Sequence, residues 1–370
     1  MPKTAKPSNP ESHITREKLL KWVGGITAVL SLIFGVIQFI RLVADVRERE
    51  RQVTEFYEVG KRQQASADYS AAWISFEQAA KSAESGGLLA KLMGQPGEQR
   101  LNVRRGQEDL AMEWLRNIRA SQGQTFSRIV EPLVLVLERG ILSATGPRKA
   151  DLIAHAGWAH FLRWREGRRD LNPEQHYRQA LEVDPTNPYA HANWGHWQLW
   201  RRERVEDANQ HFSAALSSGR ARDYVRNLQL AALKNLGSDG DSEFLTVVNE
   251  MRKNNESIEA QFRNDLYSIY YFACSRRGDS ESLTKLLAAV PAAEQVVTFR
   301  ALFYGEHDGD FDQWKRQSRD ACLATLLEAA GEREEALQMW LDVRQNLSSR
   351  DGGSLSDRAH DAIQRLSSSR

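Results

Sequence analysis

The chain has 370 residues, with 50 Lys and Arg against 49 Asp and Glu, so its formal net charge is +1. A chain so close to neutral is not expected to bind a nucleic-acid backbone over its whole surface, because such binding needs a large excess of cations. Only ten Pro residues and many stretches rich in Ala, Leu, Glu, Gln and Arg predict an all-α fold.

Residues 1–20 form a polar tail, and an uncharged apolar segment follows from Trp22 to Ile40. At about 1.5 Å per residue, a helix of this length matches the roughly 30 Å hydrocarbon thickness of a bilayer. Lys21 and Arg41 flank the segment, and Trp22 and Phe39 stand where interfacial aromatics are expected. We predict a single transmembrane helix over residues 21–41. The sequence after it continues in helical style, which argues against a cleaved signal peptide.

The orientation of this helix depends on basic residues on its two sides. The basic residues on the two sides nearly tie in number: Lys3, Lys6, Arg16, Lys18 and Lys21 precede the helix, and Arg41, Arg47, Arg49 and Arg51 follow it soon after. The balance favours a single-pass bacterial protein of the cell (inner) membrane with its larger part exported to the periplasm. The opposite orientation, with that part in the cytoplasm, stays open.

Residues 42–85 continue as a helical extension, within which a pattern of small and large residues begins at Val53. Related patterns begin at Asp151 and at Pro188, and a fourth lies near the C-terminus. Their positions are Phe56, Val59, Gly60, Tyr69, Ala72, Phe76 and Ala79; Ala156, Gly157, Asn172, Pro173, Tyr177 and Ala180; Trp194, Gly195, Ala208, Phe212 and Ala215; and Leu323, Ala324, Gly331, Ala336 and Trp340. This pattern resembles the tetratricopeptide repeat (TPR) family, which implies a right-handed superhelical solenoid of helix pairs.

Between the matched segments the pattern is weaker. Residues 86–106, which contain Gln95-Pro96-Gly97, interrupt the periodicity and predict an irregular linker. Residues 107–347 are expected to form TPR-like helical repeats. Residues 348–370 are expected to form a C-terminal cap with a short amphipathic segment from Leu355 to Leu366.

The resemblance implies a concave face that binds a partner peptide or protein. In the family's register this face holds mostly aromatic and apolar side chains, which are common anchors for a peptide. The alternative is that they pack between helices. The predicted groove residues are Trp158, Phe161, Leu162, Tyr189, His196, Leu199 and Trp200.

Arginine residues recur at the ends of the first helices of the second and third repeats. Stacked repeats would place them on one edge, as a basic rim for an acidic partner or for lipid headgroups. Neighbouring Glu166 and Asp170 keep open a solvated edge of mixed charge. The rim residues are Arg163, Arg168, Arg169, Arg201 and Arg202.

The sequence predicts no catalytic, cofactor or metal site. His155 and His160 are five residues apart, as are His191 and His196, whereas helical zinc pairs are about four apart. The segment Asp308–Asp312 begins like a calcium loop but lacks its later ligands, so it is interpreted as a turn. No phosphate-binding or nucleophile motif is present.

The two cysteines, Cys274 and Cys322, are interpreted as small buried apolar residues, and whether they are free or paired stays open. The leading hypothesis for function is a membrane-tethered scaffold whose groove binds another protein. The alternative is a structural arm or accessory subunit of a membrane enzyme or transport assembly, contacted through its edges.

Overall fold

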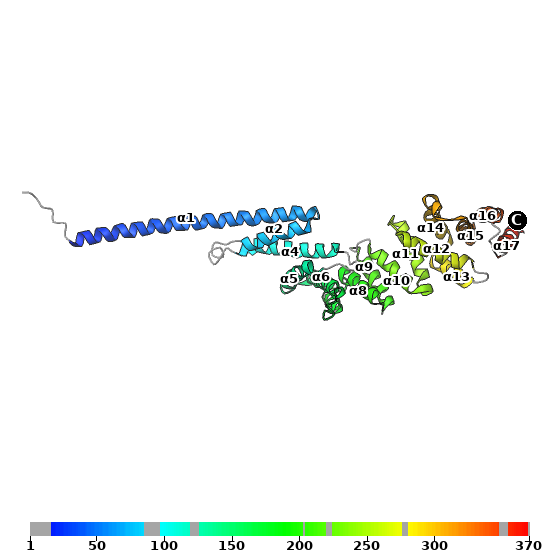
Figure 1. Cartoon of the computed structure of the whole chain (residues 1–370), viewed down its shortest axis with the longest axis horizontal. Helices are drawn as coiled ribbons and strands as arrows, with labels where there is room; N and C mark the ends of the chain where they lie inside the picture. The colour runs from blue at the N-terminus through cyan, green and yellow to red at the C-terminus, as the bar shows by residue number, and fades with distance from the viewer. Residues whose placement is uncertain are drawn as a thin grey trace, which may run out of the picture. The chain divides into compact units, whose positions relative to one another are not determined.

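A computed structural model describes residues 16–84, 97–118, 126–202, 204–219, 224–275, 280–347 and 354–368. Over these ranges the chain consists of helices and their connecting turns, without a strand, so the predicted all-α class is confirmed (Figure 1). The chain divides into two compact units, Met1–Arg119 and Ala120–Arg370.

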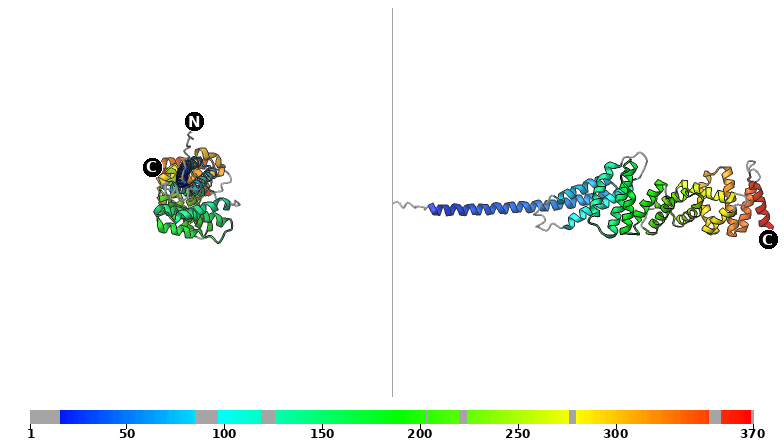
Figure 2. Two further views of the ribbon diagram at one scale, coloured as in Figure 1. Left: turned by 90° about the vertical axis from the view of Figure 1, so that its left-hand side faces the viewer. Right: turned by 90° about the horizontal axis from the view of Figure 1, so that it is seen from below.

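The first unit is built on one long helix, α1 (Arg16–Ala65), followed by α2 (Tyr69–Glu84) and α4 (Gly97–Asn117). Helix α2 packs against both α1 and α4 (Figure 2). Helix α1 carries the apolar segment in its first half and packs on α2 through its last turns, without a break between the two parts. The apolar segment and the part of α1 that packs on α2 therefore belong to one continuous helix.

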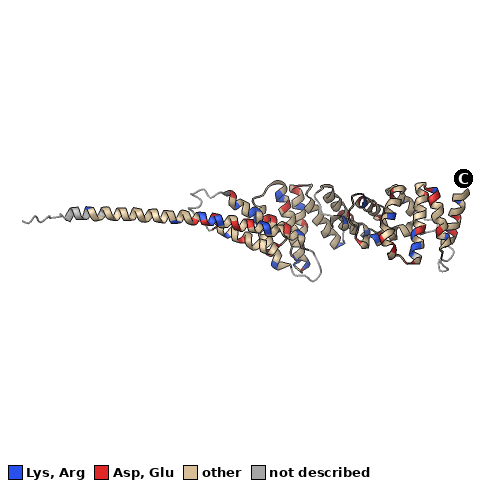
Figure 3. Ribbon diagram, turned by 90° about the horizontal axis from the view of Figure 1, so that it is seen from above, with Lys and Arg blue, Asp and Glu red and all other residues tan. Residues whose placement is uncertain are grey.

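The apolar half of α1 exposes its side chains, with Trp22 75% and Phe34 63% exposed. It is long and apolar enough to cross a membrane. Charged residues gather in the part of α1 that follows, as Figure 3 shows. An exposed apolar surface of this size is costly in water, whereas a lipid bilayer would cover it.

Half of the predicted 86–106 linker is wrong, because α4 begins at Gly97 and is helical through that range. Pro96 precedes the helix, where proline is tolerated because the first turn has unpaired N–H groups. Gly106 lies against other side chains: a Cβ there would stand 2.9 Å from the Phe76 ring and 3.0 Å from the Tyr57 ring. Gly106 therefore marks a close helix contact rather than a loop. The rest of that segment, residues 86–96, lies outside the described residues.

A glycine on one helix facing an aromatic ring on the next recurs through both units. Gly60 of α1 faces Phe76 of α2, with a distance of 3.2 Å from an added Cβ to the ring. Gly157 faces the ring of Tyr177 in the same way. The rings of Phe76 and Tyr177 are both fully buried. These contacts confirm the small and large packing positions expected from the sequence. They let the helix axes approach closely, as close packing of an interior requires.

The second unit continues with helices that mostly pack against their neighbours in the chain, including α5 on α6, α6 on α7 and α8, and α8 on α9. The helices are α5 (Ser127–Ile141), α6 (Gly146–Arg165), α7 (Pro173–Val183), α8 (Pro188–Arg201), α9 (Val205–Ser217), α10 (Tyr224–Asn235), α11 (Asp241–Lys253), α12 (Ala260–Ser275), α13 (Ser280–Ala289), α14 (Ala292–Phe303), α15 (Gln313–Ala330), α16 (Arg333–Gln345) and α17 (Ser354–Ser368), with 3-10 turns η1 (Gly237–Asp239) and η2 (Gly305–Asp310).

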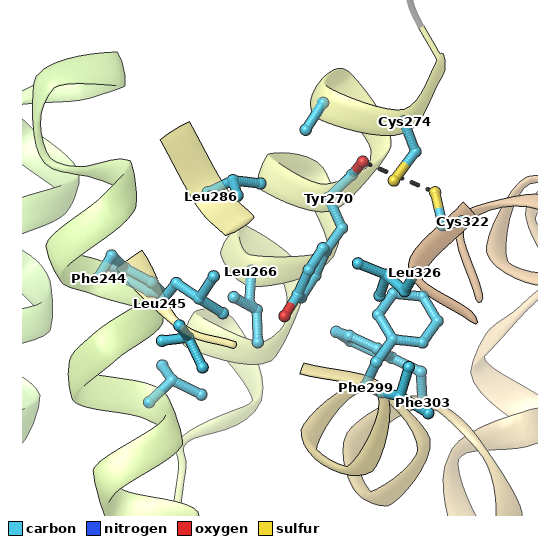
Figure 4. Packing of buried hydrophobic residues seen from close by; sticks show 14 of the residues in the cluster. Phe244, Leu245, Leu266, Tyr270, Cys274, Leu286, Phe299, Phe303, Cys322 and Leu326 are labelled. Atoms are coloured by element: carbon cyan, nitrogen blue, oxygen red, sulfur yellow. Dashed lines mark hydrogen bonds between the residues drawn. The ribbon is translucent and has the colours of Figure 1, made fainter. Parts of the chain in front are cut away.

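The largest core cluster lies among α11, α12, α14 and α15, where Phe244, Tyr270 and Phe299 are buried (Figure 4). At the C-terminus, α17 buries Ala359 and Ala362 in a cluster with Trp340 of α16. The predicted amphipathic segment from Leu355 to Leu366 is therefore confirmed as a helix with one buried face.

We predict that Gly195→Ala destabilises the chain. An added Cβ would stand 2.8 Å from the Phe212 ring and 3.0 Å from the backbone oxygen of Ala208, and the backbone cannot move aside cheaply. Overpacking costs about 1–3 kcal/mol, and the better helix propensity of alanine returns at most about 1 kcal/mol. The free energy of unfolding should therefore fall, as measured by urea denaturation of the detergent-solubilised chain.

Gly309→Ala is the matched control, because nothing lies within 4 Å of a Cβ at that position. It should leave the urea midpoint unchanged. A Gly195→Ala chain as stable as the natural one would contradict the close contact.

Candidate partner-binding surface

Helices α6 and α8 lie side by side, and a buried asparagine fixes their relative position. The side chain of Asn187 accepts a hydrogen bond from the backbone N–H of Ala190 at 2.9 Å, which caps the start of α8. Its Nδ2 donates to Oδ1 of Asp151 on α6 at 2.6 Å. Pro188 follows in the first turn, where its fixed φ suits a helix start. One fully buried residue thus caps α8 and joins it to α6.

The C-terminal ends of the same two helices meet through aromatic rings. Trp164 of α6 and Trp197 of α8 stand edge to face, with ring centroids 4.8 Å apart and an interplanar angle of 87°. Phe161 contacts Trp197 at 5.6 Å. Such offset and perpendicular arrangements are the favourable ones, because the positive ring edge meets a negative ring face.

Three arginines cover these rings from outside. The guanidinium of Arg169 lies 3.5 Å from the Trp164 ring centroid, and that of Arg165 lies 3.9 Å from the Trp200 centroid. Arg201 stands 5.3 Å from the Trp197 centroid. A cation over an indole face is attracted by the ring quadrupole. We call this set the arginine–tryptophan surface; its residues are Trp164, Arg165, Arg169, Trp197, Trp200 and Arg201.

The predicted groove is wrong for part of its residues. Phe161 and Leu162 have no exposed surface, and Trp158 is only 8% exposed. Every residue of α6 from Leu152 to Leu162 is buried, and α5, α7 and α8 all pack against this helix. A helix surrounded in this way has no open face, so these side chains hold the helices together.

The groove residues of α8 are less enclosed. Tyr189 and His196 are half-buried against the rings of His155 (4.7 Å) and Trp158 (5.3 Å) on α6. Leu199 packs on the cluster around Phe212. Trp200 alone among the predicted groove residues is exposed, at 39%.

The arginines of the predicted basic rim also differ from one another in exposure and in their partners. Arg163 is not a rim residue, because its side chain is only 13% exposed and pairs with Glu131 of α5 at 3.3 Å. Arg168 is exposed and pairs locally with Asp170 at 3.1 Å. Arg202 ends α8 in the left-handed conformation, with φ of 56°.

Only Arg169 and Arg201 of the predicted rim join the arginine–tryptophan surface. The sequence-based site did not include Trp164, Arg165 or Trp197. Their helical spacing offered a signal: Trp164 follows Phe161 by one turn, and Trp197 precedes Arg201 by one turn.

The histidines pair between helices rather than along them. The ring of His160 on α6 lies 4.5 Å from that of His176 on α7. Nδ1 of His191 on α8 lies 2.9 Å from Nδ1 of His211 on α9. No group of three or more His, Cys, Asp or Glu side chains arranged to hold a metal ion occurs among the residues that the structure describes.

The acidic segment at residues 308–312 forms a turn, as expected, and its carboxylates have structural partners. Asp308 pairs with the buried Arg319 at 2.6 Å. Asp312 caps α15 by accepting a hydrogen bond from the backbone N–H of Lys315 at 2.9 Å. Arg319 holds the pKa of Asp308 below its usual value, through a hydrogen bond and through charge.

No family model matches the chain, and a search of curated proteins finds no similar sequence. The likeness to TPR proteins is therefore carried by the spacing of the repeat residues. The contacts of Gly60, Gly157 and Gly195 with aromatic rings are compatible with it.

Burial controls the charge state of three histidines in this region. Burial, together with the second histidine of each pair, lowers the pKa of His160 and of His211 to about 4. Burial, with the nearby Arg165 charge, lowers the pKa of His196 to about 4. All three rings are neutral in the folded chain at neutral pH.

We predict that the chain loses stability on acidification. Above pH 6.5, the ordinary histidine pKa, the folded and unfolded states are both neutral at these rings. Between pH 6.5 and about 4 the unfolded chain binds protons that the folded chain excludes, so the free energy of unfolding falls. Urea midpoints measured across this range should decrease, and the part due to these histidines should level off below about pH 4.

The substitution His211→Phe isolates the contribution of His211 to this pH dependence of stability. His211 faces His191 and Trp194 of α8 and lies near Arg204 and Asp207. Phenylalanine keeps the ring contact with Trp194 but cannot bind a proton, so the pH dependence should become shallower. His360→Phe, at an exposed position of α17, is the control. Identical pH profiles for both variants would exclude this contribution.

Proposed function

We propose that this chain is a single-pass membrane protein whose helix pairs form a TPR-like solenoid that binds another protein. The apolar half of α1 supports the membrane anchor through its length, its exposed side chains and the charged residues after it. The recurring glycine–aromatic contacts support the repeat architecture. We infer the cell (inner) membrane and an exported repeat region, which protease accessibility of the C-terminus in spheroplasts would check.

The arginine–tryptophan surface carries the binding proposal. Trp200 is 39% exposed beside Arg165, and Arg169 and Arg201 are exposed as well. Tryptophan and arginine contribute most to protein interfaces, because they combine a large rigid area with hydrogen-bonding capacity. A matching partner segment would present carboxylates to the guanidinium groups and apolar side chains to Trp200.

The helix ends give this surface its shape. Its floor is the buried Trp197, 4% exposed, which cannot move because Trp164 and Phe161 pack against it. The guanidinium groups lie over rings that already restrict their motion. Less conformational entropy is therefore lost when a partner binds them.

A tether has a function of its own in this proposal. A module held at a bilayer meets partners of the same bilayer at a raised effective concentration. Modest affinity at the arginine–tryptophan surface would then be sufficient. No enzymatic step or cofactor is part of the proposal.

The continuity of α1 favours a second candidate, a structural arm in a membrane assembly. Between Arg41 and the first repeat contacts at Val53, α1 has no break. A rigid helix transmits the position of the span to the first unit, whereas a flexible linker would only limit its distance. In this role the edge contacts would fix a neighbouring subunit in place.

We predict that Trp200→Ala and Arg169→Ala each weaken partner binding without unfolding the chain. Truncating an interface anchor costs about 2 kcal/mol, or roughly 30-fold in affinity. A photo-crosslinking residue at position 200 of the full chain, in its own membrane, should yield a specific adduct. Purified partner should then bind the two alanine variants more weakly.

Arg178→Ala is the matched control, because Arg178 is an exposed arginine of α7 paired only with Glu174 in the described part of the chain. It should bind like the natural chain. Equal affinity for all three variants would reject the arginine–tryptophan surface as the binding site.

A flexible insertion separates the two candidates. We predict that a Gly/Ser segment placed between Arg41 and Leu42 leaves partner capture intact for a tethered scaffold, because only effective concentration changes. A structural arm would lose its assembly, because the position of the first unit would no longer follow from the span. Co-purification of the partner with the inserted chain measures the difference, with an Ala-rich helical insertion of one full turn as control.

A further inference from the structure

Two cysteines from different helices meet in the largest core cluster of the second unit. Cys274 lies in the last turn of α12, and Cys322 lies in the middle of α15. Both are free thiols, and they are 4% and 2% exposed. Figure 4 shows their sulfur atoms directed toward each other between the two helices.

The contacts around the sulfurs are specific. The Cys322 thiol donates to the backbone oxygen of Tyr270 at 3.6 Å, and Tyr270 precedes Cys274 by one turn of α12. The Cys274 side chain is a direct neighbour of Cys322. Helices α12 and α15 pack directly on each other, so the two thiols are held together by the surrounding core.

The surroundings do not suit a metal or a reactive thiolate. No third His, Cys, Asp or Glu completes a metal site here within the described residues. The neighbouring Cys274 side chain and burial raise the pKa of the Cys322 thiol. A protonated thiol is a poor nucleophile, and both cysteine side chains are buried from an oxidant in the folded chain. We therefore expect oxidation to occur while the two helices are still apart.

We propose that Cys274 and Cys322 are a cross-linking site, at which a disulfide-type oxidant forms an intramolecular disulfide between α12 and α15. One thiolate attacks the oxidant disulfide and releases one of its thiols. The second cysteine thiolate then attacks the resulting mixed disulfide and releases the other thiol. The two cysteines lose two protons and two electrons, and the oxidant is reduced to two thiols.

The cross-link would close the chain around α13, α14 and η2. A disulfide stabilises mainly by restricting the unfolded chain, and the effect grows with the length of the closed loop. Leu286, Phe299 and Phe303 of the core cluster lie within this closed loop. Disulfides persist outside the cytosol and are rare within it, so the oxidation state in a cell would report the side of the membrane on which the second unit lies.

The test uses the full chain in detergent, unfolded and then refolded in mixtures of reduced and oxidised glutathione. After acid quenching and denaturation, free thiols are counted with a maleimide that shifts gel mobility, and linked peptides are identified by mass spectrometry. We expect both thiols to disappear together, with one Cys274–Cys322 peptide and no glutathione adduct. Thermal unfolding of the oxidised chain should shift upward by several degrees and return when a reductant is added.

The single variants Cys274→Ala and Cys322→Ala are the matched controls. Each should leave one thiol and an unfolding temperature that does not respond to reductant. Glutathione adducts on single cysteines of the natural chain, or two free thiols after refolding in the most oxidising mixture, would overturn the proposal. Both of these results are measured on the natural chain, so the test stands even where an alanine variant fails to fold.

Discussion

The contact between a helix glycine and an aromatic ring of the next helix sets the spacing on which the remaining packing depends. Gly195 has Phe212 against its backbone, and Gly157 has Tyr177 in the same relation. Any Cβ at these positions would push the helix axes apart. Neighbouring side chains, such as the fully buried Ala208 and Ala180, are small enough to fill only the space that remains. The close approach within each helix pair therefore limits the space available to the side chains around it.

In the first unit, the same contact joins the pair to the apolar segment. Phe76 is held between Gly60 of α1 and Gly106 of α4, and its ring is fully buried. Because α1 is continuous, the residues that position Phe76 also fix the direction in which the apolar segment leaves the unit. Anchor and first repeat share one helix, which relates the proposed membrane attachment to packing rather than to a linker.

In the second unit, polar and charged groups are used in two different ways. Buried ones hold helices together: Asn187 links α8 to α6, and Arg319 fixes η2 against α15 through Asp308. Such groups tolerate burial because their hydrogen bonds are satisfied. At the ends of α6 and α8, the exposed Arg169 and the half-buried Arg165 lie on indole faces. The second arrangement joins cations to large aromatic rings at the helix ends, which is the chemical basis of the proposed binding surface.

The sequence by itself determined the helical class, the apolar segment and the glycine and aromatic positions, because these depend on local composition and on spacing along one helix. It misplaced the start of α4, which begins at Gly97, since glycines are typical of loops whereas Gly106 lies in a close helix contact. Only the tertiary structure determined that the side chains of Phe161 and Leu162 are buried. A helix's own periodicity does not reveal how many neighbours surround it, and α6 has neighbours in α5, α7 and α8. The meeting of Cys274 with Cys322, and of Trp164 with Trp197, has the same origin: each joins residues of different helices, whose distance follows from packing and not from spacing in the chain.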